Sequence, residues 1–225
     1  MQVNKLSFKH DKNAPYFFKE VSFHLEKGKI HALHGKNGMG KTILLHLLSR
    51  KIPPGGIMGG AILNEGEAIL VNQRFDHMIA DQFSFQENLK FACMGRFPNP
   101  FSRLSNPIFY PEFLEKFHID LSKPASKLSG GQRQILSLLM VLQQKVSFLL
   151  LDEPTATLDE QNAIIVFDFL KTLALKNVTL LVVCHDRDLI HRYADGTHLH
   201  LEINSEGLRQ LTTRGCSNTR PDPPF

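Results

Sequence analysis

Short continuous runs of apolar residues recur along the chain, separated by longer apolar-rich stretches of helical length. Such short runs are typical of strands buried on both faces. Strands that alternate with helices indicate an α/β fold with a mostly parallel sheet covered by helices. The predicted strands span residues 29–34, 68–71, 146–151 and 178–184, and the predicted helices span residues 43–48, 130–144 and 160–175.

The two ends of the chain follow a less regular pattern. Residues 3–8 and 21–25 are expected to form strands before the first buried run, and residues 59–67 offer further short strand fragments. Prolines and glycines at 53–56 mark a break after the first helix. The proline-containing tail, residues 213–225, is expected to be a disordered end.

The pattern changes between residues 74 and 127, where we expect a small helical insert. Ser84 and Glu87 have the spacing of a capping box, which predicts that a helix begins there, and Pro111 predicts the start of a second short helix. Most phenylalanines of the insert are expected in its own core, although some could form an exposed docking face for a partner. They are Phe83, Phe85, Phe91, Phe97, Phe101, Phe109, Phe113 and Phe117.

Composition narrows the class of protein without naming a function. The 225 residues suit one large α/β domain with an ordinary globular content of 42% hydrophobic and 21% charged residues. A net charge of +4 fits a nucleotide site or a surface near anionic lipids, but it is too weak to argue for nucleic acid. The three cysteines have no C-x-x-C spacing and are expected to be reduced thiols. No apolar run approaches the ~20 residues of a membrane-spanning helix.

A phosphate-binding loop lies between the first buried strand and the first helix. Residues 35–42 read GKNGMGKT and match G-x-x-x-x-G-K-[ST]. Glycines allow backbone N–H groups to approach a polyphosphate, and the helix that follows points its N-terminus at the same group. We expect Lys41 to contact the β- and γ-phosphates and the Thr42 hydroxyl to bind Mg²⁺.

Polar residues stand at the carboxyl ends of the other buried strands, where ligand sites of parallel sheets gather. Asp152 ends the strand 146–151 in the manner of a Walker B carboxylate, which predicts a second Mg²⁺ ligand. Glu153 comes next and is placed to deprotonate an attacking water. Gln73 and His185 follow two further strands.

Leu128-Ser129-Gly130-Gly131-Gln132 is the LSGGQ signature, and with it the chain resembles the nucleotide-binding domain of ABC ATPases. The motifs stand in family order, with Gln73 as the Q-loop glutamine, Ala156–Asp159 as the D-loop and His185 as the switch histidine. The resemblance implies a P-loop NTPase core with a small antiparallel β-subdomain and an inserted α-helical subdomain at about 74–127. The whole ABC ATPase domain would span residues 1–212.

The resemblance also implies how ATP and Mg²⁺ are held. Two subunits would sandwich two ATPs head to tail, so that the signature of one chain meets the ATP held by the P-loop of the other. Thr42, Gln73 and Asp152 would bind Mg²⁺, while Glu153, His185 and Lys41 would act in catalysis. The remaining ATP contacts would come from Gly35, Lys36, Asn37, Gly38, Met39, Gly40, Ile43, Ser129, Gly130, Gly131, Gln132 and, across the dimer interface, Asp159.

The residue that stacks on adenine departs from the family pattern. An aromatic side chain usually stands before the P-loop, and the matching position here is His10. A histidine ring stacks less well than tyrosine. Tyr16 and Phe8 remain alternatives.

The leading functional prediction is an ATPase subunit of a multi-chain ABC transporter. It would dock on separate transmembrane permease subunits, pair with itself or with another ABC ATPase, and stay on the cytoplasmic face of the membrane. The alternative is a soluble, non-transport ABC ATPase, for example in iron–sulfur cluster assembly. No partnership with nucleic acid is expected. His198 and His200 would share one strand face, but no metal-ligand spacing of a known site accompanies them.

Overall fold

The structure is a computed structural model, and it describes residues 1–72, 78–94, 106–108, 110–205 and 207–214. The described strands are β1 (Gln2–Lys9), β2 (Phe18–His24), β3 (Ile30–His34), β4 (Ile57–Leu63), β5 (Ala68–Val71), β6 (Phe148–Asp152), β7 (Thr179–Val183), β8 (His198–Ile203) and β9 (Arg209–Arg214). The described helices are α1 (Lys41–Leu48), α2 (Phe85–Ala92), α3 (Pro111–Lys116), α4 (Gly130–Val141), α5 (Glu160–Leu175) and α6 (Arg187–Tyr193), with a 3₁₀ turn at Ala125–Lys127.

The strands form one sheet in the order β4-β1-β2-β9-β8-β3-β7-β6-β5. The core half, from β8 to β5, is parallel throughout. The strands β4, β1 and β2 pair antiparallel and form the predicted β-subdomain, which is continuous with the core sheet. The predicted α/β fold with a mostly parallel core is therefore confirmed.

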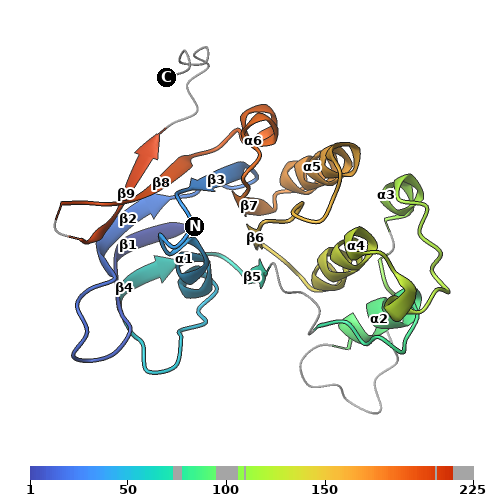
Figure 1. The fold of residues 1–225 in the computed structure, drawn as a ribbon, viewed down its shortest axis with the longest axis horizontal. Coiled ribbons are helices and arrows are strands. Elements are labelled where there is room, and N and C mark those ends of the chain that lie inside the picture. Colours follow the sequence, from blue (N-terminus) through green and yellow to red (C-terminus); the bar gives the residue numbers. More distant parts are fainter. Residues whose placement is uncertain (73–77, 95–105, 109, 206, 215–225) are drawn as a thin grey trace.

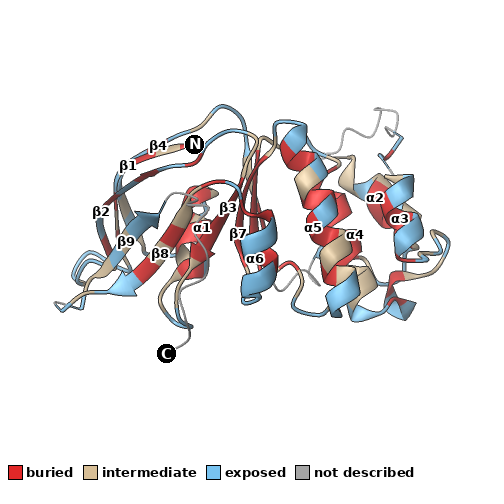
Figure 2. Ribbon diagram, turned by 90° about the horizontal axis from the view of Figure 1, so that it is seen from above, coloured by how far each residue is buried: buried red, intermediate tan, exposed pale blue. Residues whose placement is uncertain are grey.

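Alternate residues of the central strands belong to two hydrophobic cores on opposite faces of the sheet. In β6, Leu149 and Leu151 pack with α4, α5 and α6, whereas Leu150 packs with α1 and the N-terminal strands. All three leucines are almost fully buried, as expected for a parallel strand covered on both faces. Figure 2 shows this burial running through the middle of the molecule.

The helical insert packs on the far side of α4 and α5 from the sheet (Figure 1). The Ser84–Glu87 capping box begins α2 as predicted, and the Phe113 ring stacks on the α5 ring of Phe169 with 4.0 Å between centroids. Phe85, Phe113 and Phe117 are buried, while Phe83 and Phe91 are exposed. Phe97, Phe101 and Phe109 lie outside the described residues.

The C-terminal hairpin β8–β9 joins the two halves of the sheet, because β9 lies between β8 and the N-terminal strand β2. The sequence pattern did not predict β9. The strand continues through Thr213 and Arg214, two residues into the segment expected to be a disordered tail. The hairpin therefore brings residues near the C-terminus beside the P-loop.

Candidate nucleotide-binding site

The P-loop connects β3 to α1, and its backbone conformation requires glycine. Gly40 is the N-cap of α1 with φ +102°, a conformation that side chains strongly disfavour. A Cβ added there would lie 2.5 Å from the Phe17 ring. No side chain caps α1, so the first N–H groups of the helix are available to an anion.

The two predicted P-loop side chains point to different partners. The Lys41 ammonium, almost buried, donates to the carbonyl oxygens of Gly35 at 2.7 Å and Lys36 at 3.3 Å, so it lies within the turn of the loop. The Thr42 hydroxyl donates to a carboxylate oxygen of Asp152 at 2.7 Å. The structure thus brings together two of the three predicted Mg²⁺ ligands, while Gln73 lies outside the described residues.

Glu153 and His185 face each other beside this pair. His185 Nε2 lies 2.9 Å from Glu153 Oε1, across the ends of β6 and β7. Glu153 has φ +53°, and its backbone N–H donates to the Val183 carbonyl at 2.9 Å. A strained backbone held by such bonds is typical of functional residues, because the surrounding structure fixes a conformation that is otherwise rare.

A cavity of about 780 Å³ opens next to the loop and is lined by both P-loop and switch residues, including Gly35, Asn37, Lys41 and His185. Its size lies in the range of small-molecule sites. It lies at the carboxyl ends of the parallel strands, as expected for a ligand site in this fold.

The signature forms a second, separate surface at the start of α4. The Ser129 hydroxyl accepts a bond from the Gln132 N–H at 3.2 Å, and the Gln132 side chain accepts one from the Ser129 N–H at 3.2 Å. Gly130 and Gly131 open the helix behind this capping box. A shallow hollow of about 190 Å³ lies over the motif, and among the described residues it shares no lining residue with the P-loop cavity.

Asp159 caps α5 in this chain. Its two carboxylate oxygens accept from the backbone N–H and the side-chain amide of Asn162, each at 2.8 Å. Cap formation accounts for the aspartate locally, so its predicted role across a dimer interface rests on the family resemblance.

The aromatic residues before the P-loop differ in what they can contact. The His10 ring is exposed and meets the Phe17 ring edge to face at 4.8 Å between centroids. Phe8 is fully buried in the core, which leaves no ring face for a ligand. Tyr16 is exposed and lies under the Lys9 ammonium. Phe17, which sequence reasoning missed, touches the P-loop at Gly40, and the exposed His10 ring packs against it.

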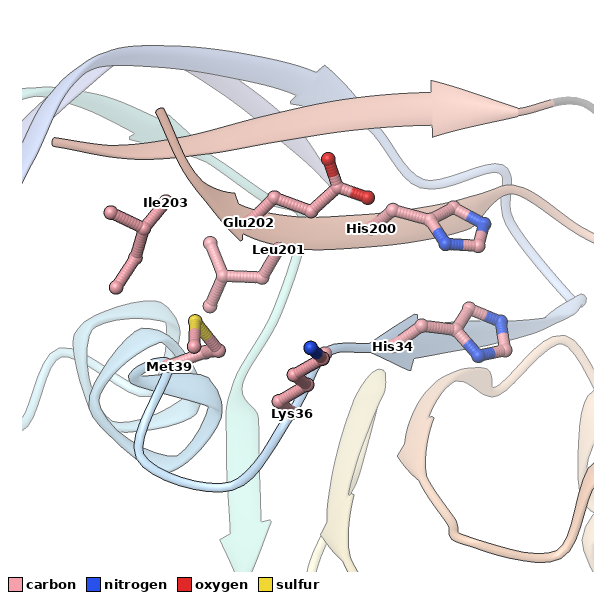
Figure 3. Close-up of a pocket in the computed structure, with 8 residues that line it drawn as sticks. His34, Lys36, Met39, His200, Leu201, Glu202 and Ile203 are labelled. Atoms are coloured by element: carbon pink, nitrogen blue, oxygen red, sulfur yellow. The ribbon is translucent and has the colours of Figure 1, made fainter. Parts of the chain in front are cut away.

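The C-terminal hairpin covers the other side of the P-loop. Figure 3 shows Met39 of the loop beneath Leu201 and Ile203 of β8, and the rings of His34 and His200 side by side along β3 and β8. These residues line a cavity of about 420 Å³ together with Lys36 and Glu202.

Three histidines stack on this face of the sheet. His34 Nε2 lies 3.0 Å from His198 Nδ1, and the His34 and His200 rings stack at 4.6 Å. Burial, followed by the nearby His200, lowers the pKa of His34 to about 4. Among the described residues, no group of three or more histidines, cysteines or carboxylates has the geometry of a metal site.

Comparison with known proteins identifies the family to which the chain's motifs belong. The model of the family described as ABC transporter matches residues 18–156. The chain belongs to the ABC transporter family. Its sequence motifs are thus those of an ATP-binding cassette.

Curated relatives of the cassette include the lipoprotein-releasing system ATP-binding protein LolD of Buchnera aphidicola, which is 30% identical over 85% of this chain and 89% of the relative. The achromobactin transport ATP-binding protein CbrD of Dickeya dadantii is 31% identical over 78% of this chain and 70% of the relative. A dimeric post-hydrolysis structure of the cassette MJ0796 with ADP and Pi shares the fold, with a TM-score of 0.72 over 97% of this chain and 99% of that one, at 18% identity.

The cassette is therefore an ATP-binding and ATP-hydrolysing member of the ABC transporter family. In the described part of the chain, no helix has both the length and the apolar character needed to cross a bilayer.

Two site residues besides Phe17 escaped sequence reasoning. Buried Gln134, on the signature helix, donates to the Glu153 carbonyl at 3.2 Å and accepts from the Thr157 hydroxyl, so it links the signature helix to the loop after β6. The sequence signal for Gln134 was its position as a polar residue within an apolar helix. Arg209 on β9 reaches the P-loop, and nothing in its local sequence indicates this.

Proposed function

We propose that this cassette hydrolyses ATP at the carboxyl ends of β3, β6 and β7, with Glu153 as the general base. Glu153 would take a proton from water as the water oxygen attacks the γ-phosphorus. The bond from the γ-phosphorus to the bridging oxygen then breaks, and ADP leaves with that oxygen. The observation that carries this proposal is the contact between Glu153 and His185, next to the Thr42–Asp152 pair.

His185 would hold Glu153 in position and donate a hydrogen bond to the γ-phosphate. Lys41 would place its positive charge against the β- and γ-phosphates, where negative charge is greatest, while the P-loop N–H groups hold the polyphosphate. His10, beside Phe17, would stack on adenine through its exposed ring.

The Thr42 hydroxyl and the Asp152 carboxylate are hard oxygen donors, and they meet within hydrogen-bond distance, which fits Mg²⁺. Thr42, Asp152 and Gln73 would hold the ion, which when bound neutralises phosphate charge. The role of this chain's residues is to orient those oxygens at the loop, as the hydrogen bond between Thr42 and Asp152 already does.

The second half of each site would come from another subunit. Ser129, Gly130 and Gly131 form an anion-binding helix start, which would close on the γ-phosphate held by the opposite P-loop. We place the assembly on the cytoplasmic face of the membrane, with the helical insert against the permease. The relatives' names give different cargos, so we assign none to this chain.

Glu153→Gln tests the assignment because it keeps the shape and removes the basicity. ATP turnover should fall about 100-fold or more, while ATP affinity, measured by titration calorimetry, stays within a few-fold of wild type. Exposed Glu115→Gln on α3 is the matched control and should hydrolyse ATP normally. Turnover near the wild-type rate in Glu153→Gln would reject the general-base role.

A further inference from the structure

The side chain of Arg209 reaches from the C-terminal hairpin to the P-loop. Its Nε–H donates to the backbone carbonyl of Met39 at 3.0 Å, although the two residues are 170 positions apart in the chain. Arg209 is only partly exposed, and burial lowers the pKa of its guanidinium group. A cation placed in a partly buried position needs compensating contacts, and the Met39 carbonyl supplies one of them.

The second contact of Arg209 is with the aromatic ring of Phe17. The guanidinium carbon lies 3.6 Å from the centre of that ring, which is a close cation–π stack. The edge of the same ring lies against Gly40, where a Cβ would come within 2.5 Å of Phe17. Arg209 therefore contacts Met39 directly and reaches Gly40 through Phe17.

These contacts orient the peptide bond between Met39 and Gly40. In a planar trans peptide, the carbonyl of one residue and the N–H of the next point in opposite directions. When Arg209 holds the Met39 carbonyl, it therefore turns the Gly40 N–H to the other side. In the described part of the chain, that N–H makes no hydrogen bond, so it is available to a phosphate oxygen.

We propose that Arg209 is a positioning residue for nucleotide binding, which aims the Gly40 N–H at the polyphosphate by holding the Met39 carbonyl and stacking on Phe17. The inference rests on the proposed use of the P-loop as the nucleotide site. Arginine suits the role because its planar group can donate from Nε and stack at the same time. Lysine has neither the fixed donor direction nor the planar face.

The test compares Arg209→Ala and Arg209→Lys with wild type. Titration with ADP measures affinity without hydrolysis, and steady-state assays separate KM for ATP from kcat. We expect Arg209→Ala to weaken ADP binding and raise KM about 10-fold, the effect of about 1.4 kcal/mol, with kcat at saturating ATP within twofold of wild type. Arg209→Lys should restore little of the loss, because charge alone does not orient the peptide bond.

Arg214→Ala removes an exposed arginine from the same strand and should bind ADP as wild type does. Thermal unfolding of the nucleotide-free variants reports on the hairpin itself. Unchanged ADP affinity in Arg209→Ala, with or without a lower melting temperature, would overturn the inference and leave Arg209 as a support for the hairpin alone. Full recovery in Arg209→Lys would also overturn it, in favour of a simple charge effect.

Phe17→Leu keeps an apolar contact with Gly40 and removes the ring face. If Phe17 and Arg209 act as one unit, combining Phe17→Leu with Arg209→Ala should weaken ADP binding by less than the product of the single effects. Fully multiplicative effects would contradict a shared role. The proposed function fails separately, if the wild-type chain itself binds no ADP.

Discussion

At the scale of single residues, most polar groups of the site already have protein partners. Thr42 bonds to Asp152, Glu153 contacts His185, and the Lys41 ammonium lies against two carbonyls of its own loop. Such contacts reduce the freedom that each side chain would lose when a ligand binds, which is the physical basis of preorganisation. The aromatic and histidine residues around the loop lead to two predictions, one on adenine binding and one on the pH dependence of stability.

The first prediction concerns the adenine contact. His10→Ala should weaken ATP binding several-fold, because a stacked base contributes ~1–3 kcal/mol, whereas His10→Tyr should preserve or tighten it with its larger ring. Calorimetric titration with ATP measures both variants. Tyr16→Ala, whose ring lies under Lys9, is measured alongside. Unchanged affinity in His10→Ala would move the adenine contact to Tyr16 if Tyr16→Ala loses affinity, and to Phe17 if it does not.

The second concerns pH. His34 has its pKa lowered to about 4, chiefly by burial, while His200, His198 and Arg187 also disfavour its charged form. Between pH 6.5 and 4 the unfolded chain binds a proton at this residue and the folded chain does not, so stability falls as pH falls. The contribution is complete above pH 6.5 and is lost towards pH 4.

His34→Leu removes that titration and keeps the position apolar. The free energy of unfolding in urea, followed from pH 7.5 to pH 5, should decline less steeply in this variant than in wild type. Exposed His24→Gln is the control and should follow the wild-type slope. An identical slope in His34→Leu and wild type would show that His34 does not carry the pH dependence.

At the scale of elements, sequence patterns predicted the elements that neighbouring residues determine. They missed the contacts between residues that are far apart in the chain. The bounds of β5 and α5, the capping box of α2 and the strand–loop–helix around the P-loop follow from neighbouring residues. The strand β9 and its arginine at the P-loop do not, because pairing between β9 and β2 joins segments that are far apart in the chain. For Asp159, the single chain shows the local role as a helix cap, whereas it does not show a role across an interface.

The helical insert supplies a prediction of its own. Asn88 of α2 is buried, and its side chain bonds to the N–H and carbonyl of Ala80 and to the carbonyls of Phe83 and Ser84. Removing it leaves the Ala80 N–H without a partner, at a cost of about 1–3 kcal/mol if it stays buried, and takes one of two hydrogen bonds from each of the three carbonyls. Asn88→Ala should therefore destabilise the chain by about 2–3 kcal/mol in chemical denaturation. Exposed Gln82→Ala, in the same loop, should have little effect, and equal stabilities would refute this role of Asn88.

At the scale of the whole molecule, the chain carries two halves of a site that lie apart. The P-loop cavity is lined by Lys41 and His185 among others, and within the described chain it shares no lining residue with the hollow over the signature at α4. A single copy can thus bind a nucleotide with one half only. In the proposed assembly, the signature residues would act when a second subunit brings its own P-loop to them.

The most direct test of the composite site is the molar mass of the Glu153→Gln variant in solution, measured by size-exclusion chromatography with light scattering. With saturating ATP and Mg²⁺ it should run as a dimer, because uncleaved γ-phosphates hold the two halves together, and with ADP it should run as a monomer. Adding Ser129→Arg should abolish the dimer, since a bulky side chain would stand where the opposite phosphate lies. A Glu153→Gln protein that stays monomeric with bound ATP, or a dimer that survives Ser129→Arg, would contradict a composite site formed by two copies of this chain.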